Sequence, residues 1–501
     1  MNVVFILSDQ HNPFFTGCYG HPIAETPAID RIARDGVRFQ NAYCSSPLCV
    51  PTRAALFTGR YVFENACWDN CIAWDGKMRG WPHFFNDNNV SLTTIGKLDF
   101  APDVDHGIET ELMASHRRSR DIHSLYRENP DNPPRWQHYQ QMNQSGPRAD
   151  LTIETFNDYK VGTRACEWLQ NERPAHRPWV LNVNYTQPHP GWPCPPALWE
   201  KWNARVKIDD LPDKHFESLD SLHPRVKITA DHQTGSFATP EDVRRGYAAY
   251  LAHCEMVDLN VQRVIDNLES LGILDETLVM YASDHGENVR AHGIWGKMNM
   301  YEDGIRVPFC MMGPDIKPGA VETSPVSHLD IFPTICDAVG VEPPADFRGI
   351  SLLAQAKADP DAARNEFILS EYHANGSPFG TFAVSDGRYK YVEFVGERGM
   401  MFDLKNDPDE FRDLLKETPS DKDVIARVKR MRGWLCGLCS PQGVDVHAKR
   451  DQAALRKEMD ADGTLVKEVV KRGYEARTDR LVVRDELIPD RFRGERKHKG
   501  E

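Results

Sequence analysis

Short apolar runs alternate with helical patterns along the first two thirds of the chain. Residues 3–7 are continuously apolar, which is typical of a strand buried on both faces of a sheet. Thr26-Pro27 and Gly36 bracket an amphipathic segment, because threonine caps a helix, proline fits its first turn and glycine ends it. The same reasoning predicts strands at 37–43, 179–185 and 277–281, and a long helix from 240 to about 271. This alternation predicts an α/β fold in which helices sandwich a large, mainly parallel sheet.

Two regions depart from this pattern. Residues 115–150 are rich in charge, proline and glutamine and offer little to bury, which predicts an excursion that serves as a lid or a partner arm. Residues 381–392 hold two strand-like runs around Asp386-Gly387, which predicts a hairpin. We therefore expect a catalytic α/β domain over 1–370, a smaller α+β domain over 371–448 and a charged, solvent-exposed arm over 449–501.

Charge and composition narrow the classes of partner. The 501 residues include 60 Lys and Arg against 74 Asp and Glu, a net charge of −14. This balance argues against nucleic acid or an anionic membrane surface as the main partner, and no apolar stretch approaches the roughly 18 residues of a membrane helix. The opening residues lack the basic start and long apolar region of a secretory signal, so we expect a cytoplasmic protein unless a leader precedes this sequence. We also expect a homo-oligomer, with the two arms as candidate contacts.

Polar side chains directly follow two of the predicted strands. Asp9 and Gln10 follow the first strand, and Asp284 and His285 follow the strand at 277–281. Because the carboxyl ends of parallel strands meet at one edge of a sheet, these four residues are candidates to lie together. Two carboxylates, an amide oxygen and an imidazole suit calcium, manganese or magnesium. The alternative is that each residue only shapes a turn or caps a helix.

The segment that begins at Cys49 carries the sharpest chemical signal. Pro51 can begin a helix, which would place Cys49 at the positive amino end, where a nucleophile is acidified. Arg53, one turn along, offers a planar fork for a tetrahedral oxyanion. A cysteine and an arginine at this spacing would alone be weak evidence, but they form part of a longer sequence motif.

The segment from Cys49 to Arg60 resembles the signature of the type I sulfatases of the alkaline phosphatase superfamily, Cys-x-Pro-Ser/Thr-Arg followed by Ser/Thr-Gly-Arg. Further similarity extends in order from residue 3 to about residue 413. The resemblance implies that a formylglycine-generating maturation enzyme converts Cys49 to formylglycine, whose hydrate is the nucleophile. It also implies the site residues: metal ligands Asp9, Gln10, Cys49, Asp284 and His285; catalytic residues Cys49, Arg53, Lys97, His189 and Lys297; and substrate-binding residues Asn70 and His292.

The implied activity is that of a metal-dependent sulfatase, which hydrolyses a small anionic ester, a sulfate monoester, to alcohol and sulfate. One divalent metal ion, calcium or manganese ahead of magnesium, would orient the hydrate and neutralise an ester oxygen. Arg53, Lys97 and Lys297, with Asn70, would stabilise the other oxygens as the hydrate attacks sulfur. His189 would protonate the leaving alcohol.

Two departures from the family pattern keep the substrate open. Asp99 stands where the family usually has histidine, in Gly96-Lys97-Leu98-Asp99. The Asp284-His285 pair is more similar to choline sulfatases and phosphonate monoester hydrolases than to the many arylsulfatases with Asp-Asn. The alternatives are a phosphonate monoester or phosphodiester hydrolase on the same site, or a catalytically silent binding protein with this fold. His106, outside these motifs, is interpreted as structural.

Overall fold

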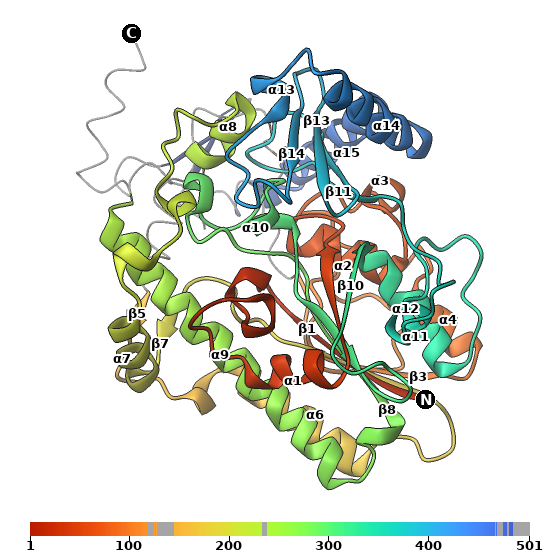
Figure 1. The fold of residues 1–501 in the computed structure, drawn as a ribbon. Coiled ribbons are helices and arrows are strands. Elements are labelled where there is room, and N and C mark those ends of the chain that lie inside the picture. The colour runs from red at the N-terminus through yellow and green to blue at the C-terminus, as the bar shows by residue number, and fades with distance from the viewer. Residues whose placement is uncertain are drawn as a thin grey trace.

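An eight-stranded sheet forms the centre of the molecule (Figure 1). The computed structural model describes residues 1–117, 125, 127, 145–232, 238–465, 467, 474–477 and 480–483. The strand order is β10-β2-β9-β8-β1-β6-β3-β4, and every neighbouring pair is parallel except the two that involve β9. The strands are β1 (Asn2–Ser8), β2 (Val37–Tyr43), β3 (Ser91–Lys97), β4 (Thr110–Ser115), β6 (Trp179–Asn184), β8 (Thr277–Ser283), β9 (Phe309–Met312) and β10 (Ala320–Ser327). The predicted α/β class with a mainly parallel sheet is confirmed.

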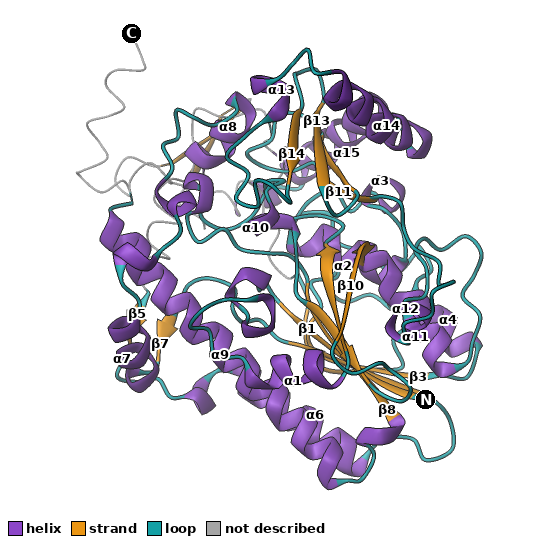
Figure 2. Cartoon of the chain, viewed as in Figure 1, coloured by secondary structure: helices purple, strands orange, loops and turns teal. Residues whose placement is uncertain are grey.

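Helices cover both faces of this sheet, as Figure 2 shows. The alternation along β1 explains the two layers, because successive side chains point to opposite faces. Val4 and Ile6 pack in one apolar cluster with α1, α6 and α9, whereas Val3, Phe5 and Leu7 pack in another with α2, α4 and α11. These helices are α1 (Pro27–Asp35), α2 (Cys49–Thr58), α4 (Trp81–Asp87), α6 (Asn157–Asn171), α9 (Pro240–Ser270) and α11 (Ile331–Val339).

The register of the central strands decides where polar groups gather. β1 and β8 run side by side with Ser8 opposite Ser283, so the residues that follow, Asp9 and Asp284, leave the sheet at the same edge. The amide of Asp284 donates to the carbonyl of Ser8 at 3.0 Å and continues that register by one step. β2 leads to the same edge, and α2 begins shortly after it at Cys49.

A second, smaller sheet follows the large one in sequence and lies above it in Figure 1. It is antiparallel and contains the predicted hairpin, with Ser385 paired to Lys390. Its elements are β11 (Ile368–Tyr372), β12 (Thr381–Ser385), β13 (Tyr389–Phe394), β14 (Met400–Asp403), α13 (Leu414–Glu417), α14 (Lys422–Leu438) and α15 (Pro441–Ala461). The remaining short elements are α3 (Val62–Asn65), α7 (Pro196–Arg205), α8 (Pro224–His232), α10 (Glu302–Ile305), α12 (Leu353–Ala356), β5 (Gly146–Pro147), β7 (Pro193–Cys194), β15 (Tyr474–Arg477) and β16 (Arg480–Val483).

A buried ion cluster joins the two sheets. The ammonium of Lys390 on β13 lies 2.9 Å from Glu302, at the start of α10, and 2.6 Å from Glu410. All three side chains are buried. The amide of Glu302 also donates to Glu410 at 2.6 Å.

The structure bears differently on the two predicted arms, residues 115–150 and 449–501. Most of the excursion at 115–150 lies outside the described residues. The charged arm was predicted to begin at residue 449, but residue 449 lies inside α15, which runs without a break from Pro441 to Ala461. Most of its charged residues lie on the exposed side of the helix, while Asp445, Gln452 and Met459 are buried against the rest of the molecule. Among the helices of the described ranges, none combines the length and apolarity needed to cross a bilayer.

Candidate active site

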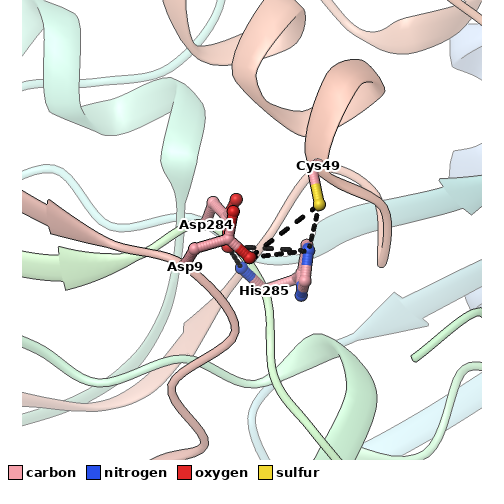
Figure 3. Close-up of side chains that lie close together, drawn as sticks. All are labelled: Asp9, Cys49, Asp284 and His285. Atoms are coloured by element: carbon pink, nitrogen blue, oxygen red, sulfur yellow. Dashed lines mark hydrogen bonds and ion pairs between the residues drawn. The ribbon is translucent and has the colours of Figure 1, made fainter. Parts of the chain in front are cut away.

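Four buried side chains meet where β1 and β8 end and α2 begins. The ligand atoms of Asp9, Cys49, Asp284 and His285 all lie within 4.8 Å of one another. Figure 3 shows them pointing toward a common centre, with Cys49 descending from the first turn of its helix. The sequence prediction that these strand ends converge is thereby confirmed in position.

His285 presents one ring nitrogen to this centre. Its Nδ1 lies 3.0 Å from the carbonyl of Gly286 and donates to it, which leaves the lone pair of Nε2 facing inward. Nε2 lies 3.2 Å from Cys49 Sγ, 3.6 Å from Asp284 Oδ1 and 4.0 Å from Asp9 Oδ1. This tautomer is the one a metal-ligating imidazole requires.

Gln10 joins the cluster through three hydrogen bonds. Its backbone amide donates to Asp284 Oδ1 at 2.9 Å, its side-chain oxygen accepts from the ammonium of Lys297, and its side-chain nitrogen donates to Glu287. Glu287 is fully buried and was not among the predicted site residues. In the sequence, the one indication of a role for Glu287 is its position two residues after His285. An acidic residue at such a position is usually a solvated turn residue.

Arg53 lies between the two aspartates. Its Nε donates to Asp284 Oδ2 at 2.9 Å, and an NH2 nitrogen lies 3.5 Å from Asp9 Oδ2. Another N–H donates to the backbone carbonyl of Lys97 at 2.6 Å, which ties α2 to the end of β3. The guanidinium is 1% exposed, so its charge acts on the site with little screening by water.

Two ammonium groups, in addition to Arg53, bring positive charge to the site. Lys97 bonds Asp9 directly, and Lys297 donates to Cys49 Sγ at 3.3 Å. Burial and the charge of Asp9 raise the pKa of the Cys49 thiol, but the ammonium groups of Lys297 and Lys97 hold it well below its usual value. The structure therefore favours negative charge at position 49, as a nucleophile requires.

The two aspartates respond to this setting in opposite directions. Burial favours the neutral acid at Asp9, but Lys97 and the other nearby cations hold its pKa well below its usual range. Burial and the charge of Asp9 raise the pKa of Asp284. A divalent cation between the two carboxylates would relieve their repulsion, and oxygen donors with one imidazole fit such an ion. The residues present therefore fit a metal, and Asp9, Gln10, Asp284 and His285 would hold it.

The three remaining predicted residues differ in how closely they approach this centre. Asn70 accepts from the amide of Val50 at 3.2 Å and so lies beside the first turn of α2. His189 is partly exposed, its Nδ1 bonds the carbonyl of Pro190 at 2.7 Å, and its charge helps to lower the pKa of Asp9. His292 is tied elsewhere, because its Nδ1 bonds Glu217 at 2.6 Å and its ring stacks on Tyr301.

The structure combines a mainly parallel α/β sheet with a buried cluster of Asp, Cys and His residues that could hold a metal ion. The chain belongs to the sulfatase family, the sulfuric ester hydrolases: the family model described as Sulfatase matches residues 1–341, and one described as N-sulphoglucosamine sulphohydrolase, C-terminal, matches residues 290–432. The resemblance seen in the sequence is confirmed.

Similar proteins span most of the chain. Choline-sulfatase of Rhizobium meliloti (strain 1021) is 29% identical over 454 residues, which cover 86% of each chain. Arylsulfatase K of Mus musculus is 30% identical over 442 residues, 83% of this chain and 76% of the mouse protein. Among solved structures, phosphonate monoester hydrolase SpPMH from Silicibacter pomeroyi superposes with a TM-score of 0.71 at 22% identity, over 88% of this chain and 96% of its own.

Proposed function

We propose that this protein is a metal-dependent sulfatase that uses a formylglycine derived from Cys49 to hydrolyse a sulfate monoester to alcohol and sulfate. The observation that carries the proposal is the position of Cys49 Sγ, 3.2 Å from His285 Nε2 and 3.3 Å from Lys297 Nζ. Position 49 thus lies between the candidate metal ligands and the cations that would receive an ester oxygen. The hydrate of formylglycine supplies an oxygen nucleophile, which a thiol lacks.

The metal, bound by Asp9, Gln10, Asp284 and His285, would act as a Lewis acid toward the ester. The chain's own residues supply the rest of the charge complementarity. Arg53, Lys97 and Lys297 are held in place before substrate arrives by their bonds to Asp284, Asp9 and Gln10. Such pre-organised donors stabilise charge that develops on the transferring group without a cost of reorganisation.

His189 is the candidate general acid for the leaving alcohol. The loop that carries it is anchored by Asp158, which accepts hydrogen bonds from the amides of Thr186 and Gln187 at 2.9 and 2.7 Å. The partly exposed imidazole lies near enough to Asp9 for its charge to act there. A group at the boundary between the buried centre and solvent can protonate an alcohol that departs outward.

A second candidate activity is the hydrolysis of phosphonate monoesters or phosphodiesters. The fold superposes on a phosphonate monoester hydrolase with a TM-score of 0.71. Three fixed cations would bind a singly charged tetrahedral ester whether its centre is sulfur or phosphorus. Aryl sulfates, choline sulfate, phenylphosphonate monoesters and phosphodiesters therefore belong in the same screen.

The mass of the proteolytic peptide over residues 42–60, from protein made in its native host, tests the proposal directly. We expect formylglycine at position 49, installed by a maturation enzyme in the same compartment, and hydrolysis of at least one sulfate ester. Cys49→Ala should abolish turnover while the circular dichroism spectrum and the metal content stay near wild type. An active Cys49→Ala variant would overturn the mechanism.

A further inference from the structure

Three potential metal ligands gather at the open edge of the large sheet, around the edge strand β4. His106 precedes this strand, Glu111 is its second residue, and His116 follows it. Their ligand atoms lie within 4.8 Å of one another. None of the three belongs to the sulfatase motifs described above, and the sequence had suggested only a structural role for His106.

A bend in β4 brings Glu111 and His116 together. The pairing of β4 with β3 shifts register between Ile95 and Lys97, and Met113 has a φ of 48°, in the left-handed region. Such a bulge re-aims the side chains on either side of it. As a result, Glu111 Oε2 lies 2.8 Å from His116 Nε2 although five positions separate the residues.

His106 supplies the third ligand from the other side. Its Nδ1 lies 3.5 Å from Glu111 Oε1, and its ring lies 5.1 Å from that of His116, with 23° between the planes. The side chain is 1% exposed, and neither ring nitrogen forms a hydrogen bond within the described part of the chain. Nδ1 thus has only the long approach to Glu111, and Nε2 has no hydrogen-bond partner among the described residues. A buried polar atom without a partner is costly, so a ligand bound here would stabilise the ring.

The surroundings suit a bound cation. Trp74 and Phe100 pack against the His106 ring at 5.4 and 5.2 Å and form an apolar wall behind it. Glu111 directs one carboxylate oxygen toward each ring, Oε1 toward His106 and Oε2 toward His116. The cluster thus offers a carboxylate and two imidazoles beside an apolar wall.

We propose that His106, Glu111 and His116 form a second metal site and bind one zinc ion. Two imidazole nitrogens and one carboxylate are a common three-ligand zinc set, with the fourth position left to water or another donor. The set is richer in nitrogen than the oxygen-rich cluster around Asp9, so the two sites would select different ions.

This site adjoins the segment that carries Lys97. The carbonyl of Ser115, next to His116, accepts hydrogen bonds from the amides of Leu98 and Asp99 at 3.1 and 3.0 Å. Arg117, on the other side of His116, lies 4.0 Å from the Asp99 carboxylate. Zinc on His116 would therefore fix the backbone on which Lys97 and Asp99 rest. Zinc binding itself does not depend on the proposed sulfatase activity.

Zinc titration in excess calcium tests the site. With millimolar calcium present to occupy the oxygen-rich cluster, we expect wild-type protein to bind one equivalent of zinc tightly by isothermal titration calorimetry. His106→Gln and His116→Gln should each weaken this binding at least 100-fold. His176→Gln, at an exposed histidine outside the cluster, should bind zinc as wild type does.

X-ray absorption at the zinc edge then identifies the ligands. We expect only nitrogen and oxygen neighbours, including imidazole scattering that is lost in the His116→Gln variant. Sulfur neighbours would place the ion at a cysteine and overturn the proposal, as would equal zinc affinity in wild type and both variants. Circular dichroism checks the fold, and if His106→Gln unfolds, His116→Gln, at a partly exposed position, carries the comparison.

Discussion

The Asp99 carboxylate lies 3.2 Å from the ammonium of Lys97, which also bonds Asp9 in the buried cluster. A carboxylate at this position, where the family usually has histidine, would repel an anionic ester if it were unpaired. It is paired, because Lys97 and Arg117 both flank it. Asp99 has a φ of 60°, a left-handed conformation that aspartate tolerates better than most residues. We therefore interpret Asp99 as a positioning residue for Lys97.

Asp99→Asn tests this interpretation. Loss of the charge should leave Lys97 less firmly held and lower kcat/KM about 10- to 100-fold, the usual range for residues that orient a functional group. Metal content should not change. Asp87→Asn, at an exposed aspartate on α4, should behave as wild type. Unchanged kcat/KM in the Asp99 variant would mean that Lys97 needs no such support.

Asp284→Asn should remove the metal from the principal site. The substitution also deprives the buried guanidinium of Arg53 of its closest carboxylate, and breaking such a pair costs about 3–5 kcal/mol. Added calcium should raise the urea midpoint of wild type but not that of the variant, because only the folded state with an intact site binds the ion. Elemental analysis after gel filtration measures the bound metal.

The matched control for this substitution is Asp275→Asn, at an exposed position just before β8. It should keep both metal content and the response to calcium. Equal metal content in the two variants would show that the ligands are assigned wrongly.

Gln452 supports the Asn70 segment from α15. Its side-chain nitrogen donates to Asp69 at 2.7 Å and to the carbonyl of His373 at 2.8 Å. Because Asn70 is the proposed substrate-binding residue, Gln452→Ala should raise KM several-fold with a smaller effect on kcat, and should destabilise the fold by about 1–3 kcal/mol. Steady-state kinetics beside Gln442→Ala, an exposed change on the same helix, provide the comparison. A fall in kcat at constant KM would contradict the prediction.

Glu371 predicts a pH dependence of stability. Burial raises its pKa to about 8, although the amides of Phe63 and Val62 oppose the rise. Burial, with Arg127, lowers the pKa of His373 well below its usual value, so protonated Glu371 donates to the neutral imidazole at 2.8 Å. The stability from this acid is complete below about pH 4.5 and is lost as pH rises through about 8, at about 1.4 kcal/mol for each unit of the pKa shift.

Glu371→Gln should flatten that dependence, since an amide can donate to His373 at any pH. We expect the free energy of unfolding of the variant, relative to wild type, to increase between pH 5 and pH 9. Glu366→Gln, at an exposed glutamate, should leave the wild-type profile in place. Parallel profiles for wild type and Glu371→Gln would show that Glu371 does not titrate in this range.

The sequence was sufficient to locate the centre of the site because the required signals are local. A buried apolar run followed by Asp9, another followed by Asp284-His285, and a proline two residues after Cys49 each specify one strand or helix end. Parallel pairing then brings those ends together, as the register of Ser8 with Ser283 shows.

The features that the sequence did not predict depend on contacts between distant residues. The carboxylate of Glu287 is buried with hydrogen bonds from the amides of Val289 and Gly296 and from the side chain of Gln10, which is distant in the sequence. The His106 cluster depends on the bulge at Met113. The sequence has no turn residue at that position from which the bulge could be predicted. The sequence predicted a solvent-exposed arm from residue 449, inside α15, because the many charges of this helix concealed the spacing of the residues that it buries, among them Met459.

The buried Lys390 makes the small sheet inseparable from the reaction centre. Glu302, its partner, comes five residues after Lys297, so the ion cluster anchors the chain segment that continues from a proposed catalytic ammonium. A chain cut after residue 370 would remove Lys390 and leave the buried Glu302 carboxylate with the longer ion pair to Arg306, at 3.6 Å, and the hydroxyl of Tyr43, at 3.2 Å. The C-terminal unit is therefore a structural part of the enzyme rather than a module that can be exchanged or shed, and both sheets should melt in one calorimetric transition.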